Sequence, residues 1–214
     1  LRPSGNKGPV ATSWTSFQDY QRNEAWVWEH LALTRAAAIV GPDDLIRDID
    51  EFRVALADLR NFETVAPALS KMRARISSVK SDRSTWDFKI GPGRLQDIEL
   101  FSQMGSLLAG QKEQSVAAGI TGLVDLGIID QAQGDTLQTA YEQFWTLQLG
   151  SKLLSEGAFD PEIVGDGGQS FILGLSKSDQ LDTLQNKTML RETAARSIIE
   201  TVLPEPQEDV DERG

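Results

Sequence analysis

The residues best suited to chemistry gather in one stretch, Glu24-Ala-Trp-Val-Trp-Glu-His30, with Arg35 shortly after it. On one continuous helix, Glu24, Trp28 and Arg35 would share a face. Charged groups beside buried tryptophans are costly unless they are paired. The stretch is therefore either an internal ion-pair network or, together with Glu29 and His30, a polar cluster near a nucleotide or metal. His30, the only histidine, is more typical of a hydrogen-bonded structural residue than of a ligand.

Two further groups of residues could serve a nucleotide or a metal. The segment Arg2-Pro-Ser-Gly-Asn-Lys-Gly8 brings two cations and Ser4 close to glycines, which suits a phosphate, but it lacks the Walker spacing and also fits an ordinary surface loop. Asp97 and Glu99 are two residues apart, so on a regular helix they point about 200° from each other and cannot hold one metal ion. A structural cap or ion-pair role is expected for them.

Composition excludes several classes of function. The 214 residues carry 21 Lys and Arg against 32 Asp and Glu, a formal charge of −11, which disfavours nucleic acid and anionic membranes as partners. The absence of cysteine excludes thiolate zinc sites, iron–sulfur clusters and a cysteine nucleophile. No apolar run approaches the roughly 20 residues of a membrane span, and no signal peptide is visible, so we expect a cytoplasmic protein. The residues alone disclose no catalytic constellation and no metal site.

Helical periodicity dominates from about Ser16 onward, which predicts an all-α bundle. We expect two helices or one bent helix over Ser16–Val40, with Trp26–Val40 buried on two sides as a central strut. A loop is expected at Gly165–Gly168, and a disordered acidic tail from Pro204. The other expected helices are Pro42–Leu59, Asn61–Val79, Arg94–Ala109, Val116–Leu126, Gln131–Leu154 and Ser176–Val202.

Three blocks in order resemble the bifunctional glutamine synthetase adenylyltransferase/adenylyl-removing enzyme. They are Leu1-Arg-Pro-Ser-Gly5 with Tyr20–Ala36, then Met72-Arg73, then Asp87–Phe101. From about Lys112 we expect agreement only in helical character. The Tyr-Gln-x-Asn-Glu-Ala-Trp-x-Trp-Glu-His form resembles the C-terminal unit of that family. That unit, by resemblance, uses ATP and Mg²⁺ to transfer AMP to a tyrosine of glutamine synthetase, under the control of a PII-type signalling protein and glutamine.

The resemblance implies three parts: residues 1–15 as the loop or strand that ends an α/β nucleotidyltransferase domain, 16–203 as the helical domain, and 204–214 as the tail. The family's metal-binding carboxylates precede Leu-Arg-Pro-Ser-Gly. The chain, a fragment or processed product because it begins with Leu1, is therefore expected to be inactive alone and to bind no cofactor tightly. Arg2 is the implied neighbour of the triphosphate, with Ser4 and Lys7 beside it. Arg73, Asp97 and Glu99 are implied to be structural or to lie at an interface.

Two positions depart from the family pattern. Arg94 stands where a second glycine is usual after Gly-Pro-Gly, which places a cation at the unfavourable end of a helix. The helix around Ala140–Leu149 lacks the basic and histidine residues expected before its Leu-Gln-Leu. The alternative is a stand-alone, non-catalytic module that binds glutamine synthetase or a PII protein; the related uridylyltransferase class fits the Trp-Glu-His block less well.

Overall fold

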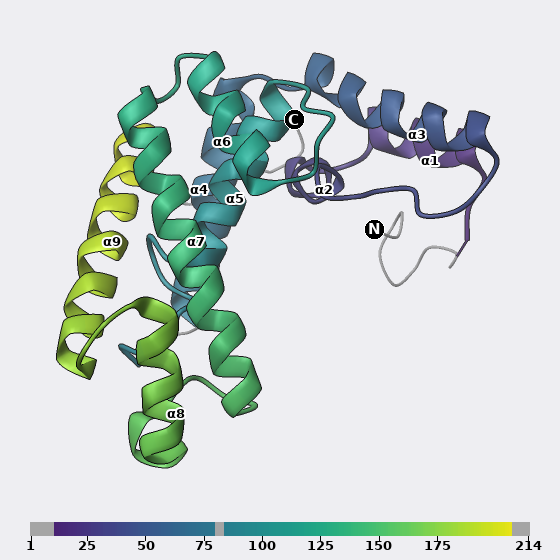
Figure 1. Cartoon of the computed structure of the whole chain (residues 1–214). Coiled ribbons are helices and arrows are strands. Elements are labelled where there is room, and N and C mark those ends of the chain that lie inside the picture. Colours follow the sequence, from purple (N-terminus) through teal and green to yellow (C-terminus); the bar gives the residue numbers. More distant parts are fainter. Residues whose placement is uncertain (1–10, 80–83, 207–214) are drawn as a thin grey trace. The chain divides into compact units, whose positions relative to one another are not determined.

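The computed structural model describes residues 11–79 and 84–206 (Figure 1). These residues form helices and connecting loops without a strand, which confirms the all-α prediction. The helices are α1 (Trp14–Asn23), α2 (Val27–Leu33), α3 (Asp43–Ala55), the 3₁₀ helix η2 (Leu56–Leu59), α4 (Phe62–Val79), α5 (Leu95–Leu108), α6 (Val116–Asp125), α7 (Gln131–Leu154), α8 (Pro161–Ser176) and α9 (Leu181–Val202).

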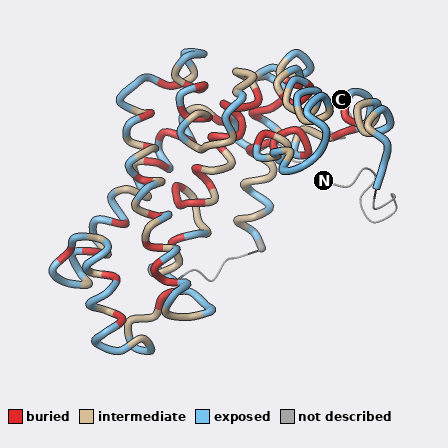
Figure 2. Tube along the Cα trace, turned by 45° about the vertical axis from the view of Figure 1, so that its right-hand side comes forward, coloured by how far each residue is buried: buried red, intermediate tan, exposed pale blue. Residues whose placement is uncertain are grey.

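The chain folds as two compact units. Among the described residues, unit 1 comprises those up to Met72, Leu100–Ile128 and those from Leu203, and unit 2 comprises Arg73–Glu99 and Ile129–Val202. The division falls within α4 and within α5. In both units the helices are amphipathic, and Figure 2 shows buried stretches alternating with exposed ones along them. No helix in the described part of the chain is both long and apolar enough to cross a membrane.

Unit 1 is built on a close crossing of α5 and α6. A Cβ added to Gly119 would lie 2.2 Å from the backbone oxygen of Ser102, and one added to Gly105 would lie 2.1 Å from the backbone oxygen of Gly119. Gly122 approaches the oxygen of Gly105 in the same way, at 2.8 Å. Only glycine allows two helix backbones to come this close. The crossing helps to form a core that includes Leu56, Val65, Leu69, Phe101, Met104 and Leu123.

The prediction of a central helix over Trp26–Val40 is wrong, because the helix is shorter and less buried than expected. Helix α2 ends at Leu33, and the next amides bond three residues back, with the amide of Ala36 donating to the oxygen of Leu33 at 3.0 Å. The Thr34 hydroxyl donates to the carbonyl of Leu31 at 2.7 Å, which competes with helical continuation. Ile39 is therefore 94% exposed, and Trp28 is 46% exposed rather than buried.

Unit 2 packs α7, α8 and α9 around apolar stripes. The Asp130 side chain caps α7 by accepting from the backbone amide of Gln133 at 2.8 Å. In turn, the side-chain oxygen of Gln133 accepts from the backbone amide of Asp130. This capping box fixes the start of the helix. The buried apolar side chains of α7 recur at helical spacing, and they are Leu137, Ala140, Phe144 and Leu147. They meet Ile172 from α8 and Leu184, Ala195 and Ile199 from α9 in the core of unit 2.

The prediction of a loop at Gly165–Gly168 is wrong, because these residues lie inside α8. Gly165 has φ 64° and ψ −179°, so the helix is broken at that residue, but helical structure resumes directly after it. The last helix also begins later than predicted, at Leu181, because Lys177 takes a left-handed conformation that ends α8. Pro204 is not part of a free tail, since its carbonyl accepts from the Ser70 hydroxyl at 2.6 Å. Residues 207–214 lie outside the described part of the chain.

Candidate functional site

The expected phosphate-binding residues Arg2, Ser4 and Lys7 lie outside the described residues. In the described part of the chain, a buried carboxylate joins α1 to α2. Glu29 is 2% exposed and accepts hydrogen bonds from the Tyr20 hydroxyl at 3.1 Å and from the backbone amide of Trp26 at 3.0 Å. One side chain thus joins the end of α1 to the start of α2.

His30 completes this polar cluster in unit 1. The Nε of Arg60 donates to Nδ1 of His30 at 3.0 Å, and a terminal nitrogen of Arg60 donates to the carbonyl of Ala25 at 2.8 Å. Because Nδ1 accepts, the proton of the neutral imidazole is on Nε2, which lies 2.9 Å from the carbonyl oxygen of Gln21. His30 is 1% exposed, and both its ring nitrogens are engaged. The imidazole therefore joins three chain segments and is not placed to transfer a proton.

Acidification should weaken unit 1 through His30. Burial, followed by the nearby Arg60 charge, lowers the pKa of His30 from 6.5 to about 4, although the bond to Gln21 opposes the shift. The unfolded chain therefore binds a proton at a higher pH than the folded one, so the stabilisation is complete above about pH 6.5 and is lost as the pH falls toward 4. We expect the free energy of unfolding to fall by up to about 1.4 kcal/mol per pH unit in that range.

Urea unfolding at about pH 7 and about pH 5 measures this effect. His30→Gln is the matched control, because the amide of glutamine can still donate to the Gln21 carbonyl but does not titrate. The variant should show a shallower decline with acid than the parent chain. Equal declines in the two proteins would contradict a role for His30.

Glu24, Trp28 and Arg35 do not form the single stripe that their spacing predicts. Glu24 follows the last residue of α1, and Arg35 lies beyond the end of α2, so no one helix carries all three. The structure buries Glu29 and His30, each within hydrogen bonds to neighbouring segments, whereas Glu24, Trp28 and Arg35 are exposed. Arg60, which completes the cluster, has no local signal in the sequence because it lies 30 residues from His30.

In unit 2, Arg73 and Asp97 form a buried ion pair. The two nitrogens of Arg73 lie 2.5 and 2.8 Å from the two carboxylate oxygens, and the side chains are 14% and 8% exposed. Asp97 also accepts from the backbone amide of Gly93 at 2.7 Å, which closes the loop before α5. The hydrogen bonds to Asp97 raise the pKa of Arg73 against the opposing effect of burial. Glu99 lies on the same helix, α5.

The charge of Arg94 at the start of α5 is compensated, contrary to the expectation of an unfavourable cation there. Its side chain is 9% exposed, and its Nε lies 3.0 Å from a carboxylate oxygen of Glu192 in α9. A second guanidinium nitrogen donates to the carbonyls of Ser84 and Asp87. The carboxylate and the two carbonyls offset the unfavourable helix dipole.

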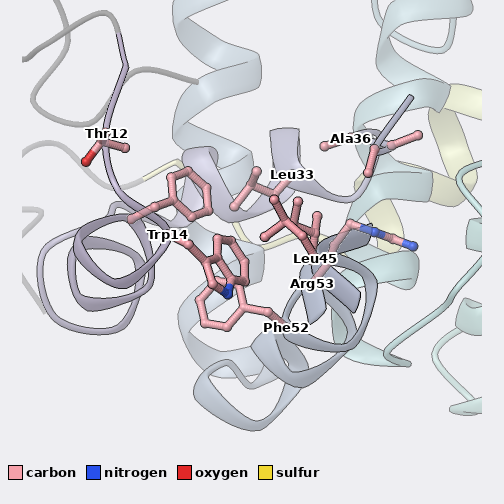
Figure 3. Close-up of a pocket in the computed structure, with 11 residues that line it drawn as sticks. Thr12, Trp14, Leu33, Ala36, Leu45, Phe52 and Arg53 are labelled. Atoms are coloured by element: carbon pink, nitrogen blue, oxygen red, sulfur yellow. The ribbon is translucent and has the colours of Figure 1, made fainter. Parts of the chain in front are cut away.

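An apolar pocket of about 380 Å³ lies between α1, α3 and the segment after α2 (Figure 3). Figure 3 shows Trp14, Leu33, Leu45 and Phe52 directed toward one another. Trp14 meets Phe52 edge to face at 5.4 Å between ring centroids, and it stacks on Phe17 at 5.7 Å. The remaining lining residues are Thr12, Ala36, Ala37, Ala38, Ile49 and Arg53.

Among the described residues that line the pocket, Arg53 is the only charged one. It is 7% exposed, and its two terminal nitrogens donate to the carbonyls of Thr34, Gln111 and Lys112. Burial lowers the pKa of Arg53, while Asp50 opposes the shift. Its guanidinium thus holds backbone segments of unit 1 together. The sequence carries no signal for the pocket, because the apolar spacing of Leu45, Ile49 and Phe52 on α3 fits a closed core equally well.

Within the described residues no group of three or more histidines, aspartates or glutamates is placed to hold a metal ion. The charged clusters instead bind backbone groups and each other. The arrangement can position chain segments and offer an apolar surface. It does not assemble a nucleophile with a base, or carboxylates around a common point.

A family model described as "Glutamate-ammonia ligase adenylyltransferase" matches residues 1–52. Among curated proteins, the bifunctional glutamine synthetase adenylyltransferase/adenylyl-removing enzyme of Rhizobium meliloti is 40% identical over 169 residues, which are 76% of this chain and 17% of that protein. The enzyme of the same name from Mesorhizobium japonicum is 34% identical over 201 residues, 92% of this chain and 20% of its own length. The chain belongs to the glutamate-ammonia ligase adenylyltransferase family.

The family match extends further than the sequence blocks indicated. An alignment that covers 92% of this chain reaches well past Lys112, where only helical character was expected to agree. The Brucella suis relative is 45% identical over 108 residues, 50% of this chain and 11% of that protein. The chain spans about a fifth of the length of the first two relatives.

Proposed function

We propose that this chain is the helical part of an enzyme that transfers AMP from ATP to a tyrosine of glutamine synthetase. The observation that carries the proposal is similarity over most of the chain to relatives that are named for this activity. The three sequence blocks, with the Trp-Glu-His form, support the adenylyl-transferring unit in particular. A cytoplasmic location and control by a PII-type protein belong to the same proposal.

In this proposal the chain has a structural role and does not itself catalyse the transfer of AMP. AMP transfer requires Mg²⁺ held by carboxylates, and the described residues do not fit such a site. The carboxylates belong to the part of the enzyme that precedes Leu1 in the family pattern. In this proposal Glu29 and His30 have a structural role, because they join α1, α2 and Arg60 within unit 1.

Transfer of labelled AMP from ATP to glutamine synthetase tests the proposal. The chain alone should give no label above a blank without protein. The same chain extended upstream of Leu1 by its nucleotidyltransferase unit should label glutamine synthetase. A glutamine synthetase whose target tyrosine is replaced by phenylalanine is the control substrate. Reproducible transfer by the chain alone would contradict the assignment of its role.

One observation favours a second candidate, a non-catalytic module that binds glutamine synthetase or a PII protein. Trp145 and Leu149 on α7 are 43% and 49% exposed, and Phe171 and Leu175 on α8 are 40% and 37% exposed. Both α8 side chains lie over Gly150 of α7, so neighbouring helices of unit 2 each carry exposed apolar side chains. Binding of either partner to the chain alone, unchanged by Mg-ATP, would favour the module.

A further inference from the structure

We propose that the apolar pocket of unit 1 is the surface on which the nucleotidyltransferase unit of the parent enzyme packs. This inference rests on the proposed function and adds an internal interface to it. Every lining residue falls within residues 12–53, and the family model matches residues 1–52. The pocket therefore belongs to the part of the chain that carries the family's adenylyltransferase signature.

The pocket is too apolar to be left in water. Three aromatic rings and several aliphatic side chains line it, and no described segment fills its roughly 380 Å³. The chain continues from the pocket wall into Ile39 and Val40, which are 94% and 91% exposed. Apolar surface left in water is unfavourable, and covering it is a main driving force of association. A contiguous surface of this kind marks a contact with another folded element.

A small ligand suits this pocket less well than protein side chains do. A ligand site normally offers a few converging polar groups that fix orientation. Here the two terminal nitrogens of Arg53 already donate to three carbonyls, which leaves the Nε of Arg53 and the hydroxyl of Thr12 as the polar groups of the described wall. The shape and chemistry match apolar side chains from a packed domain.

A second copy of this chain is also disfavoured. Helix α3 forms one wall of the pocket and carries five acidic residues, Asp43, Asp44, Asp48, Asp50 and Glu51, against two arginines, Arg47 and Arg53. Two copies meeting at this face would bring their acidic helices together, and like charges across an interface oppose association. The partner is therefore an apolar face bordered by Lys or Arg. The relatives, about five times longer than the aligned segment, have ample chain to supply it.

Cysteine labelling tests the inference, because this chain contains no cysteine. Ala37 lines the pocket and is exposed, so Ala37→Cys is a small change that leaves the fold intact. Ala117 on α6 is exposed outside the pocket and gives the matched control, Ala117→Cys. Maleimide labelling of each position is followed by mass spectrometry, which resolves the modified peptide even where the extended chain has thiols of its own.

In the chain alone both cysteines should react at similar rates. In the chain extended upstream of Leu1, Cys at position 37 should react at least about tenfold more slowly, while Cys at position 117 should change by less than about twofold. Equal rates at position 37 in the two proteins would overturn the inference. Protection that grows with the concentration of the chain alone would also overturn it, in favour of a second copy.

AMP transfer by the extended protein separates this inference from the proposed function. Protection at position 37 in a protein without transfer activity would support the interface and contradict the function. Transfer activity without protection would support the function and contradict the interface.

Discussion

Gly119→Ala is expected to lower the free energy of unfolding by about 3 kcal/mol. The new methyl group would lie 2.2 Å from the backbone oxygen of Ser102 and 2.7 Å from the Ser106 hydroxyl oxygen. A backbone oxygen cannot move aside as a flexible side chain can, so α5 and α6 must separate and open the core around Leu123. Urea unfolding followed by far-UV circular dichroism measures the loss.

Gly174→Ala is the matched control for this substitution. Gly174 lies in α8, and an added Cβ would meet no atom within 4 Å. Alanine there should stabilise the helix by about 0.5–1 kcal/mol, because it loses less backbone entropy on folding. If Gly119→Ala proved as stable as Gly174→Ala, the close crossing of α5 and α6 would be wrong.

Asp97→Ala is expected to cost about 3 kcal/mol or more, because it leaves the buried charge of Arg73 without its carboxylate. The same change removes the acceptor for the amide of Gly93, so the loop before α5 also loses a bond. The double variant Arg73→Met with Asp97→Ala should lose less than the sum of the two single changes. Urea unfolding of the four proteins gives this coupling directly.

The exposed pair of Arg47 and Asp48 provides the control for Asp97. Its nitrogen and oxygen are 3.8 Å apart, and the side chains are 64% and 49% exposed. Solvent screens such a pair, so Asp48→Ala should change the free energy of unfolding by less than about 0.5 kcal/mol. An equally small effect of Asp97→Ala would show that the buried pair does not stabilise unit 2.

Local signals in the sequence predicted most helices, since caps and apolar spacing act within a few residues. The capping residue Asp130 and the stripe from Leu137 to Leu147 determine α7, and Pro42 with two aspartates determines the start of α3. The early end of α2 could not be predicted in this way. It depends on the Thr34 hydroxyl taking the carbonyl of Leu31, which competes with a pattern that otherwise favours helix.

The candidate site was even harder to predict from local sequence signals, because it depends on residues that are far apart in the sequence. Glu29 and His30 could be singled out by type and position, but their cluster depends on Arg60, which folding brings from beyond α3. Leu45, Ile49 and Phe52 recur on α3 at the spacing of a helix face that packs on a core, yet they line an open pocket. The spacing of apolar residues shows that a helix face must pack against something. It does not show which part of the protein packs there.

Arg94 and Glu192 restrict the order in which this sequence can change over generations. A chain with Arg94 but no acid at position 192 carries an unpaired cation at the positive end of α5. A chain with Glu192 and glycine at position 94 leaves a partly buried carboxylate without its partner. A substitution at only one of the two positions therefore gives a less stable protein, whereas substitution at both positions together does not. The two positions are therefore expected to be inherited together, although 98 residues separate them.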